Sequence, residues 1–102
     1  MQIASQVGDN TAVLSLKGRF DFHSHRDFRA AYETALDAAG VREIEINFAE
    51  VDYLDSSALG MLLLLREKAE TLGKRVSLSG LRGTVKQVLD IANFGKLFPV
   101  KP

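Results

Sequence analysis

The chain is 102 residues long and 46% hydrophobic, with 13 basic and 13 acidic side chains and no cysteine. This length suits one domain over residues 1–102. Because the charges balance, no net electrostatic field favours binding to nucleic acid or to an anionic membrane. The absence of cysteine excludes a disulfide framework and a thiolate metal site. The N-terminus lacks the basic flank and apolar run of a signal peptide, and the longest apolar stretch, residues 61–65, is too short to span a bilayer, so we expect a cytoplasmic protein.

The beginning of the chain predicts a β-hairpin. Residues 3–7 favour a short strand, and the turn that follows, residues 8–10, is rich in the residue types that favour tight turns. Residues 12–16 favour a second strand, in which period-two alternation places three apolar side chains on one face: Ala12, Leu14 and Leu16. Because the connection is short, we expect the two strands to be antiparallel.

A loop and a helix are expected next. Gly18 is predicted to end the second strand, and residues 19–24 to form a loop. Ser24, with Asp27 three positions later, is predicted to be the N-cap of a helix that runs to about residue 39. Gly40 has the residue type that commonly closes a helix. The apolar stripe of this helix has helical spacing and comprises Phe28, Ala31, Tyr32, Ala35, Leu36 and Ala39.

The middle of the chain predicts a strand and a long helix. Over residues 44–48 apolar side chains alternate with polar ones, which indicates a half-buried strand. After a polar turn, a helix is expected from about residue 57 to residue 72, where Gly73 stops it. Its buried stripe is predicted to comprise Leu59, Leu62, Leu63, Ala69 and Leu72, widened by Met61, Leu64 and Leu65.

The last part predicts a strand around residues 76–78, a loop over residues 80–84 and an amphipathic helix. Val85, Val88, Leu89 and Ala92 form the apolar face of that helix, and residues 97–100 form an extended tail packed by Phe98. Strands that alternate with helices imply parallel crossovers, whose right-handedness places the helices on one sheet face. We therefore expect a mixed sheet of about four strands, with the segments at residues 18–23 and 52–57 meeting at one sheet edge.

The polar turn between the central strand and the long helix carries the candidate functional residues. Asp55 or Ser56 is suited to cap the helix, because a short oxygen-bearing side chain there accepts from the first free amides. The same amides can receive an added anion such as a phosphate. Spacing alone favours a helix cap over a phosphorylation site.

Residues 55–60, Asp-Ser-Ser-Ala-Leu-Gly, resemble the Asp-Ser-Ser-Gly-Leu-Gly signature of STAS domains, in particular the bacterial anti-sigma-factor antagonists. Residues 18–21 are similar to the family's Gly-x-Leu-Asp, residues 46–55 to its central strand and loop, and residues 85–94 to its last helix. The resemblance thus covers nearly the full chain. Ala58 stands where the family has glycine, and alanine suits a first helical turn because of its high helix propensity. At the end of the last helix, Asn93 can adopt the left-handed conformation that glycine would supply.

The resemblance implies a switch in protein binding and no catalytic activity. The first serine after the aspartate is the phosphoacceptor in this family, and here it is Ser56. Unphosphorylated protein is expected to bind an anti-sigma factor that is also a serine kinase, which frees a sigma factor. Phosphorylation with ATP is expected to dissociate this complex, and a PPM-type phosphatase to restore the serine. The protein is expected to be a monomer. The implied environment of the phosphosite comprises Asp21, Asp55, Ser57, Asn47, Ala58 and Leu59.

Other classes of function stay open. A small STAS subunit or scaffold of a membrane transporter, such as a lipid-transport ABC complex, fits the length, although such subunits often lack the double serine. A nucleotide-binding module finds no support, because the chain has no Gly-rich phosphate loop. His23 and His25 with Asp21 are too few for a metal site, and no hydrolase motif surrounds Ser56. Phe22 and Tyr53 are candidates either for contacting a partner or for core packing.

Overall fold

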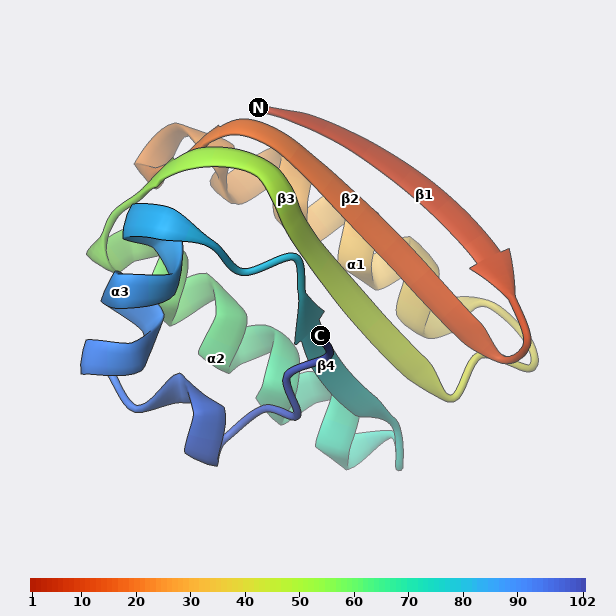
Figure 1. The fold of residues 1–102 in the computed structure, drawn as a ribbon. Helices are drawn as coiled ribbons and strands as arrows, with labels where there is room; N and C mark the ends of the chain where they lie inside the picture. Colours follow the sequence, from red (N-terminus) through yellow and green to blue (C-terminus); the bar gives the residue numbers. More distant parts are fainter.

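Four strands form one mixed sheet in the order β1-β2-β3-β4 in the computed structural model, which describes residues 1–102 (Figure 1). The strands are β1 (Gln2–Gly8), β2 (Thr11–Phe20), β3 (Glu43–Leu54) and β4 (Arg75–Ser79). β1 is antiparallel to β2, while β2 with β3 and β3 with β4 are parallel pairs. The predicted mixed sheet with an N-terminal hairpin is therefore confirmed.

Three helices cover one face of this curved sheet (Figure 1). They are α1 (His25–Asp37), α2 (Ser56–Thr71) and α3 (Gly83–Ile91), with short 3-10 turns η1 (Phe22–Ser24) and η2 (Phe94–Lys96). Asn93, between α3 and η2, has φ of 60°, the left-handed conformation predicted for it. None of the helices has the length and apolar character needed to cross a bilayer.

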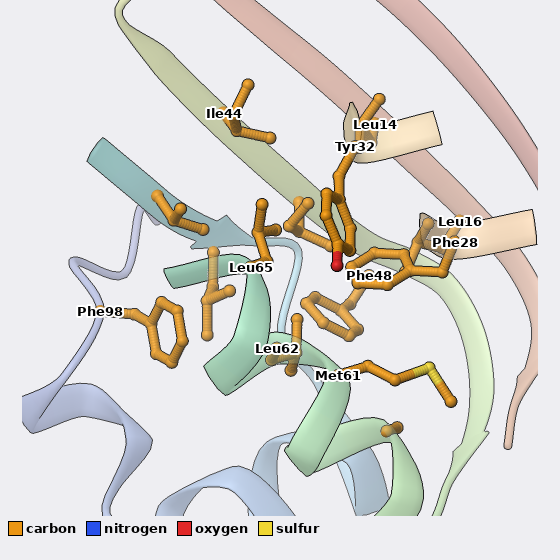
Figure 2. Close-up of a cluster of buried hydrophobic side chains, with 14 of the residues drawn as sticks. Leu14, Leu16, Phe28, Tyr32, Ile44, Phe48, Met61, Leu62, Leu65 and Phe98 are labelled. Atoms are coloured by element: carbon orange, nitrogen blue, oxygen red, sulfur yellow. The ribbon is translucent and has the colours of Figure 1, made fainter. Parts of the chain in front are cut away.

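The core lies between the sheet and the helices. Alternate strand residues point into it, so Leu14, Ile44 and Ile46 are fully buried, as is Phe98 of the tail. Figure 2 shows Leu14, Ile44 and Phe98 around α2, with the rings of Phe28, Tyr32 and Phe48 on the α1 side. This core fixes the position of α2, and hence of the turn from which α2 begins.

The two central strands are longer than the sequence predicts. Gly18 does not end β2: it adopts φ of 100°, and the strand continues to Phe20. β3 likewise extends to Leu54 instead of ending near residue 48. Two register shifts between the strands, at residues 15–17 and 18–19 of β2, allow pairing to continue past the irregular backbone. A glycine was therefore a bulge position here and not a strand terminator.

The predicted buried stripe of α2 is wrong at three positions. Leu63, Leu64 and Leu72 are 41%, 47% and 54% exposed. The buried residues are Ala58, Met61, Leu62, Leu65 and Ala69. Five consecutive apolar residues, 61–65, cover every direction around a helix, because each is rotated by about 100° from the last, so sequence alone did not identify the inward face.

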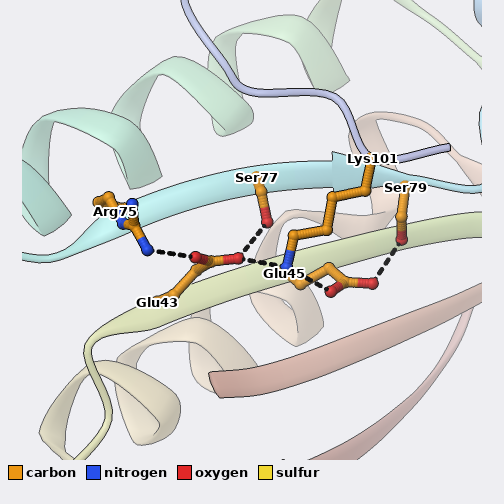
Figure 3. Close-up of polar contacts among 6 residues, drawn as sticks. All are labelled: Glu43, Glu45, Arg75, Ser77, Ser79 and Lys101. Carbon is orange, nitrogen blue, oxygen red and sulfur yellow. Dashed lines mark hydrogen bonds and ion pairs between the residues drawn. The ribbon is translucent and has the colours of Figure 1, made fainter. Parts of the chain in front are cut away.

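The open face of the sheet carries a cluster of polar side chains, which we call the carboxylate cluster: Glu43, Glu45, Arg75, Ser77, Ser79 and Lys101 (Figure 3). Glu43 lies 2.6 Å from Lys101 Nζ and 3.0 Å from an Arg75 nitrogen, and accepts from Ser77 Oγ at 2.8 Å. The tail reaches this face because Val100 forms a parallel bridge with Leu78. Although Glu43 lies on the polar face of the strand, its partners bury it.

Candidate functional site

Asp55 is the N-cap of α2. Its backbone is extended, with φ of −112°, and its Oδ1 accepts from the amide of Ala58 at 3.1 Å. Ser56 is the first helical residue and is exposed, while Ser57 is half-buried. Since Asp55 fills the cap, the Ser56 hydroxyl is not needed to start the helix. We call residues 55–57 the acceptor turn.

The end of β2 lies against the acceptor turn, as the sequence predicts. Phe20 pairs with Leu54 in the sheet, and the Phe20 carbonyl accepts from the amide of Asp55 at 3.3 Å. The 3-10 turn η1, which begins two residues after Phe20, is in contact with α2. Both segments emerge at the carboxyl ends of parallel strands, the edge at which open α/β sheets usually place their sites.

Asp21 holds the corner between β2 and α1. Its Oδ1 accepts from the amide of His23 at 3.0 Å, and its Oδ2 lies 3.6 Å from Arg19 Nε. Ser24, predicted to cap α1, makes no cap hydrogen bond to that helix. Instead its buried hydroxyl accepts from the Asp21 amide at 3.2 Å and donates to the Arg19 carbonyl at 3.0 Å. Ser24 therefore takes part in the capping box of η1 and not in a cap of α1. Its two hydrogen bonds tie the corner to the end of β2.

Arg19 is a cation at the edge of the site that sequence reasoning did not place. It is the register partner of Tyr53, and its guanidinium carbon lies 4.0 Å from the centroid of the Tyr53 ring. Such a cation–π contact stabilises the guanidinium over the ring by about 0.5–1 kcal/mol at an exposed position. The signal was hidden because pairing of residues 19 and 53 depends on both register shifts.

The remaining candidate residues have different surroundings. Asn47 lies well before the acceptor turn on β3, where its Oδ1 accepts from the amide of Ala49 at 2.9 Å beside a register shift. That bond satisfies an irregular stretch of the β3 backbone. Ala58 is fully buried under the turn, and Leu59 is half-buried. The replacement of the family's glycine by Ala58 therefore adds a core contact.

The site is a turn at the surface and not a cleft. None of the surface hollows of the molecule is lined by Asp55, Ser56 or Ser57. His23 and His25 are both exposed, and no three His, Asp or Glu side chains converge as metal ligands would. A turn of this shape offers its hydroxyl to another macromolecule more readily than it encloses a small ligand.

Comparison with known proteins is consistent with this geometry. A family model described as "Mlab, STAS domain" matches residues 3–99. A STAS-domain containing protein of Pseudomonas aeruginosa is 44% identical over 88 residues, which cover 86% of this chain and 85% of that protein. The anti-sigma F factor antagonist of Paenibacillus polymyxa is 21% identical over 98% of this chain and 86% of its own length.

Solved structures with the same fold include the anti-sigma factor antagonist SpoIIAA of Bacillus. Its unphosphorylated form superposes with a TM-score of 0.76 at 26% identity, over 99% of this chain and 88% of that one. Its phosphorylated form gives a TM-score of 0.74 at 25% identity, over 99% and 92%. With a family match across almost its whole length, the chain belongs to the STAS-domain family.

Proposed function

We propose that this protein is a phosphorylation-switched binding protein whose acceptor is Ser56. The observation that carries the proposal is the exposed hydroxyl of Ser56 at the first position of α2, directly after an N-cap that Asp55 already fills. Ser57, the other hydroxyl of the turn, is half-buried. A kinase that approaches from solvent therefore has better access to Ser56.

The partner in this proposal is an anti-sigma factor that is also a serine kinase. It binds the unphosphorylated protein and releases a sigma factor. The kinase then transfers the γ-phosphoryl group of ATP to Ser56 Oγ, the hydroxyl proton is lost, and ADP leaves. A PPM-type phosphatase reverses the modification by hydrolysis. The protein itself acts by binding, as a monomer in the cytoplasm, and not by catalysis. Support for this scheme comes from SpoIIAA, an anti-sigma factor antagonist whose structure is known in both phosphorylation states.

The electrostatics of the acceptor turn predict where the phosphate acts. Phosphorylation adds roughly −1.5 to −2 charges. The free amides of the helix start favour an exposed anion by about 0.3–1 kcal/mol, whereas the carboxylate of Asp55 opposes it. Asp21 opposes it less, because Arg19 lies beside it at 3.6 Å. These effects are small and opposite in sign, so the fold is expected to change little.

Binding, in contrast, is expected to be lost. A partner surface fitted to a small neutral hydroxyl would have to bury a dianion without a matching cation, which is costly. The effect of phosphorylation is therefore located at the interface. Charge-mimicking substitutions at the same position should act in the same direction, though less strongly.

The experiment compares wild type with Ser56→Ala, Ser57→Ala and Ser56→Asp for binding to the cognate kinase and for phosphorylation with ATP. Ser56→Ala should bind and should resist phosphorylation, Ser57→Ala should be phosphorylated, and Ser56→Asp should bind much more weakly. Phosphorylation of Ser56→Ala but not of Ser57→Ala would move the acceptor by one residue. If none of the substitutions changes binding or phosphorylation, the switch is refuted and a scaffold role in a transporter complex becomes the better account.

A further inference from the structure

Two large apolar side chains in the neighbourhood of Ser56 are exposed to solvent. Phe22, in η1, is 70% exposed, and Leu63, in α2, is 41% exposed. Exposed apolar side chains of this size are unfavourable in water unless another surface covers them. The position of Leu63 relative to the acceptor turn is fixed by α2, and that of Phe22 by the connection between β2 and η1.

Leu63 lies on the same side of α2 as Ser56. Seven residues separate the two, which is nearly two helical turns, so both side chains leave the helix in almost the same direction about 10 Å apart along its axis. Leu62 and Leu65 point away from this side of the helix, toward the sheet, and are fully buried. Between Ser56 and Leu63 the helix surface is low, because Gly60 has no side chain and no neighbour lies within 4 Å of the position of a Cβ there.

Phe22 is held near the acceptor turn by the end of β2. The hydrogen bond from the Asp55 amide to the Phe20 carbonyl, 3.3 Å long, joins the two segments. Standard backbone dimensions then keep the Cα atoms of Phe22 and Ser56 within about 14 Å of each other. The Phe22 ring has an edge contact with the ring of His23, with centroids 5.9 Å apart, and still remains largely exposed.

The backbone that carries Phe22 is already ordered. Asp21 and Ser24 close η1 with reciprocal hydrogen bonds, and the Ser24 hydroxyl ties the turn to β2 through the Arg19 carbonyl. A partner that covers Phe22 therefore has little backbone freedom to remove, and a phenyl ring has few rotatable bonds to order. Rigid aromatic side chains of this kind are typical anchors in protein interfaces.

We propose that Phe22 and Leu63 are the apolar anchors by which the serine kinase binds this protein around Ser56. This inference rests on the proposed function, because the kinase is the occupant that must reach Ser56 Oγ. A standard interface covers about 800 Å² on each partner, a disc of roughly 16 Å radius. Centred on Ser56, such a disc includes both anchors. It excludes Leu72, equally apolar and 54% exposed, which lies about 24 Å away along α2.

The test measures phosphorylation of Ser56 at varied concentrations of the purified protein. The probe is the kinase purified from the source cells by its ability to phosphorylate the wild-type protein with ATP. Phe22→Ala and Leu63→Ala should each raise KM for the protein substrate about tenfold while kcat changes less than threefold, since uniform binding is lost and the reacting groups are not. Leu72→Ala is the matched control and should change KM less than twofold.

Two further variants separate lost anchoring from lost folding. Phe22→Leu keeps an apolar side chain, so its KM should be close to that of the wild type. Leu63→Gln loses the apolar surface, so its KM should resemble that of Leu63→Ala. Denaturant melts are used to compare all variants at equal folded fraction. Unchanged KM for both Phe22→Ala and Leu63→Ala, with normal phosphorylation of the wild type, overturns the anchors and leaves the acceptor intact. If the wild-type protein is not phosphorylated on Ser56 at all, the proposed function fails and the anchors fail with it.

Discussion

The carboxylate cluster on the open sheet face and the acceptor turn at the end of β3 are both polar, but they differ in how many partners each polar group has. In the cluster, Glu43 is bonded by Lys101, Arg75 and Ser77 together. In the acceptor turn, Asp55 accepts one amide hydrogen bond and Ser56 remains exposed beside it. Partners that saturate a carboxylate hold two strands and a tail in place. A hydroxyl left open at a helix start is available to another molecule.

The number of bonding partners of a polar side chain, together with its exposure, therefore separates structural from candidate functional residues, whatever their chemical type. Every buried side-chain nitrogen and oxygen in the chain has a hydrogen-bond partner, so no orphaned group marks a hidden site in the interior. The candidate for function is instead a solvent-exposed group on a rigid support. Substitutions in the cluster should therefore change stability alone, and those in the acceptor turn should change modification and binding first.

The support under the acceptor turn should give the largest effect. Leu62→Ala removes a fully buried side chain of α2 and should cost about 2–5 kcal/mol of unfolding free energy. Leu63→Ala, one residue further, truncates an exposed side chain and should cost about 0.5 kcal/mol or less. Denaturant melts of the pair measure both. Equal losses would show that the inward face of α2 has been misassigned and that Leu63 is not free for a partner.

The carboxylate cluster should give the next largest effect. Glu43→Ala leaves the buried Ser77 hydroxyl without its partner and should cost about 1–3 kcal/mol, with the rate of Ser56 phosphorylation unchanged at equal folded fraction. Lys17→Ala removes the cation from an exposed ion pair with Glu50 and serves as the control, with a change below about 1 kcal/mol. A Glu43→Ala protein that is folded but poorly phosphorylated would remove the division between the two regions.

The helix cap of the acceptor turn should matter less for stability. Asp55→Ala removes the acceptor for the Ala58 amide and should cost about 1 kcal/mol. Asp55→Asn, which can still cap, should recover most of that stability. If Asp55 also faces the kinase, both variants should lower the phosphorylation rate although only one of them loses stability. A rate that follows stability in both variants would limit Asp55 to its structural role.

The smallest expected effect is a pH dependence that belongs to the cluster alone. The hydrogen bond from Lys101, aided by Ser77, holds the pKa of Glu43 below its ordinary value of 4.5. A lowered folded-state pKa contributes stability that is present above pH 4.5 and is lost as the pH falls through the folded value. Thermal melts between neutral and acidic pH should show this loss in wild type and less of it in Glu43→Gln. An identical acid slope in both proteins would contradict the assignment.

At alkaline pH the same contact acts with the opposite sign. The hydrogen bonds to Glu43 and then Glu45 raise the pKa of Lys101 above its ordinary value of 10.5. This stabilisation is present below pH 10.5 and is lost as the pH rises through the folded value. The contribution of the cluster should therefore be constant across the intervening range, in which phosphorylation assays are performed.

The fold was accessible from the sequence because its signals are local. Alternating apolar residues in β2 and β3 and the turn at residues 8–10 suffice to predict the hairpin and the parallel sheet, which the structure confirms. Helix faces in an unbroken apolar run were not accessible. The orientation of Leu63 and Leu64 depends on which side of α2 meets the sheet, and that is decided by packing and not by local pattern.

The candidate site was predictable in part for the same reason. Asp55 and Ser56 are neighbours in sequence, so the helix start and its free hydroxyl follow from local chemistry. Asn47 was grouped with them by resemblance, yet its bond to Ala49 places it within the sheet. Arg19 was not assigned, and the choice between partner contact and core packing stayed open for Phe22, because their relation to the turn depends on the register shifts between β2 and β3 and on the corner held by Ser24.

The measurement that tests the central claim most directly is phosphopeptide mass spectrometry of this protein purified from its own cells, before and after treatment with a PPM-type phosphatase. A switch based on the acceptor turn predicts one phosphoryl group on Ser56, none on Ser57, and its removal by the phosphatase. Phosphate on Ser57 alone, or a protein that stays unmodified in cells and after incubation of their lysate with ATP, would contradict the account.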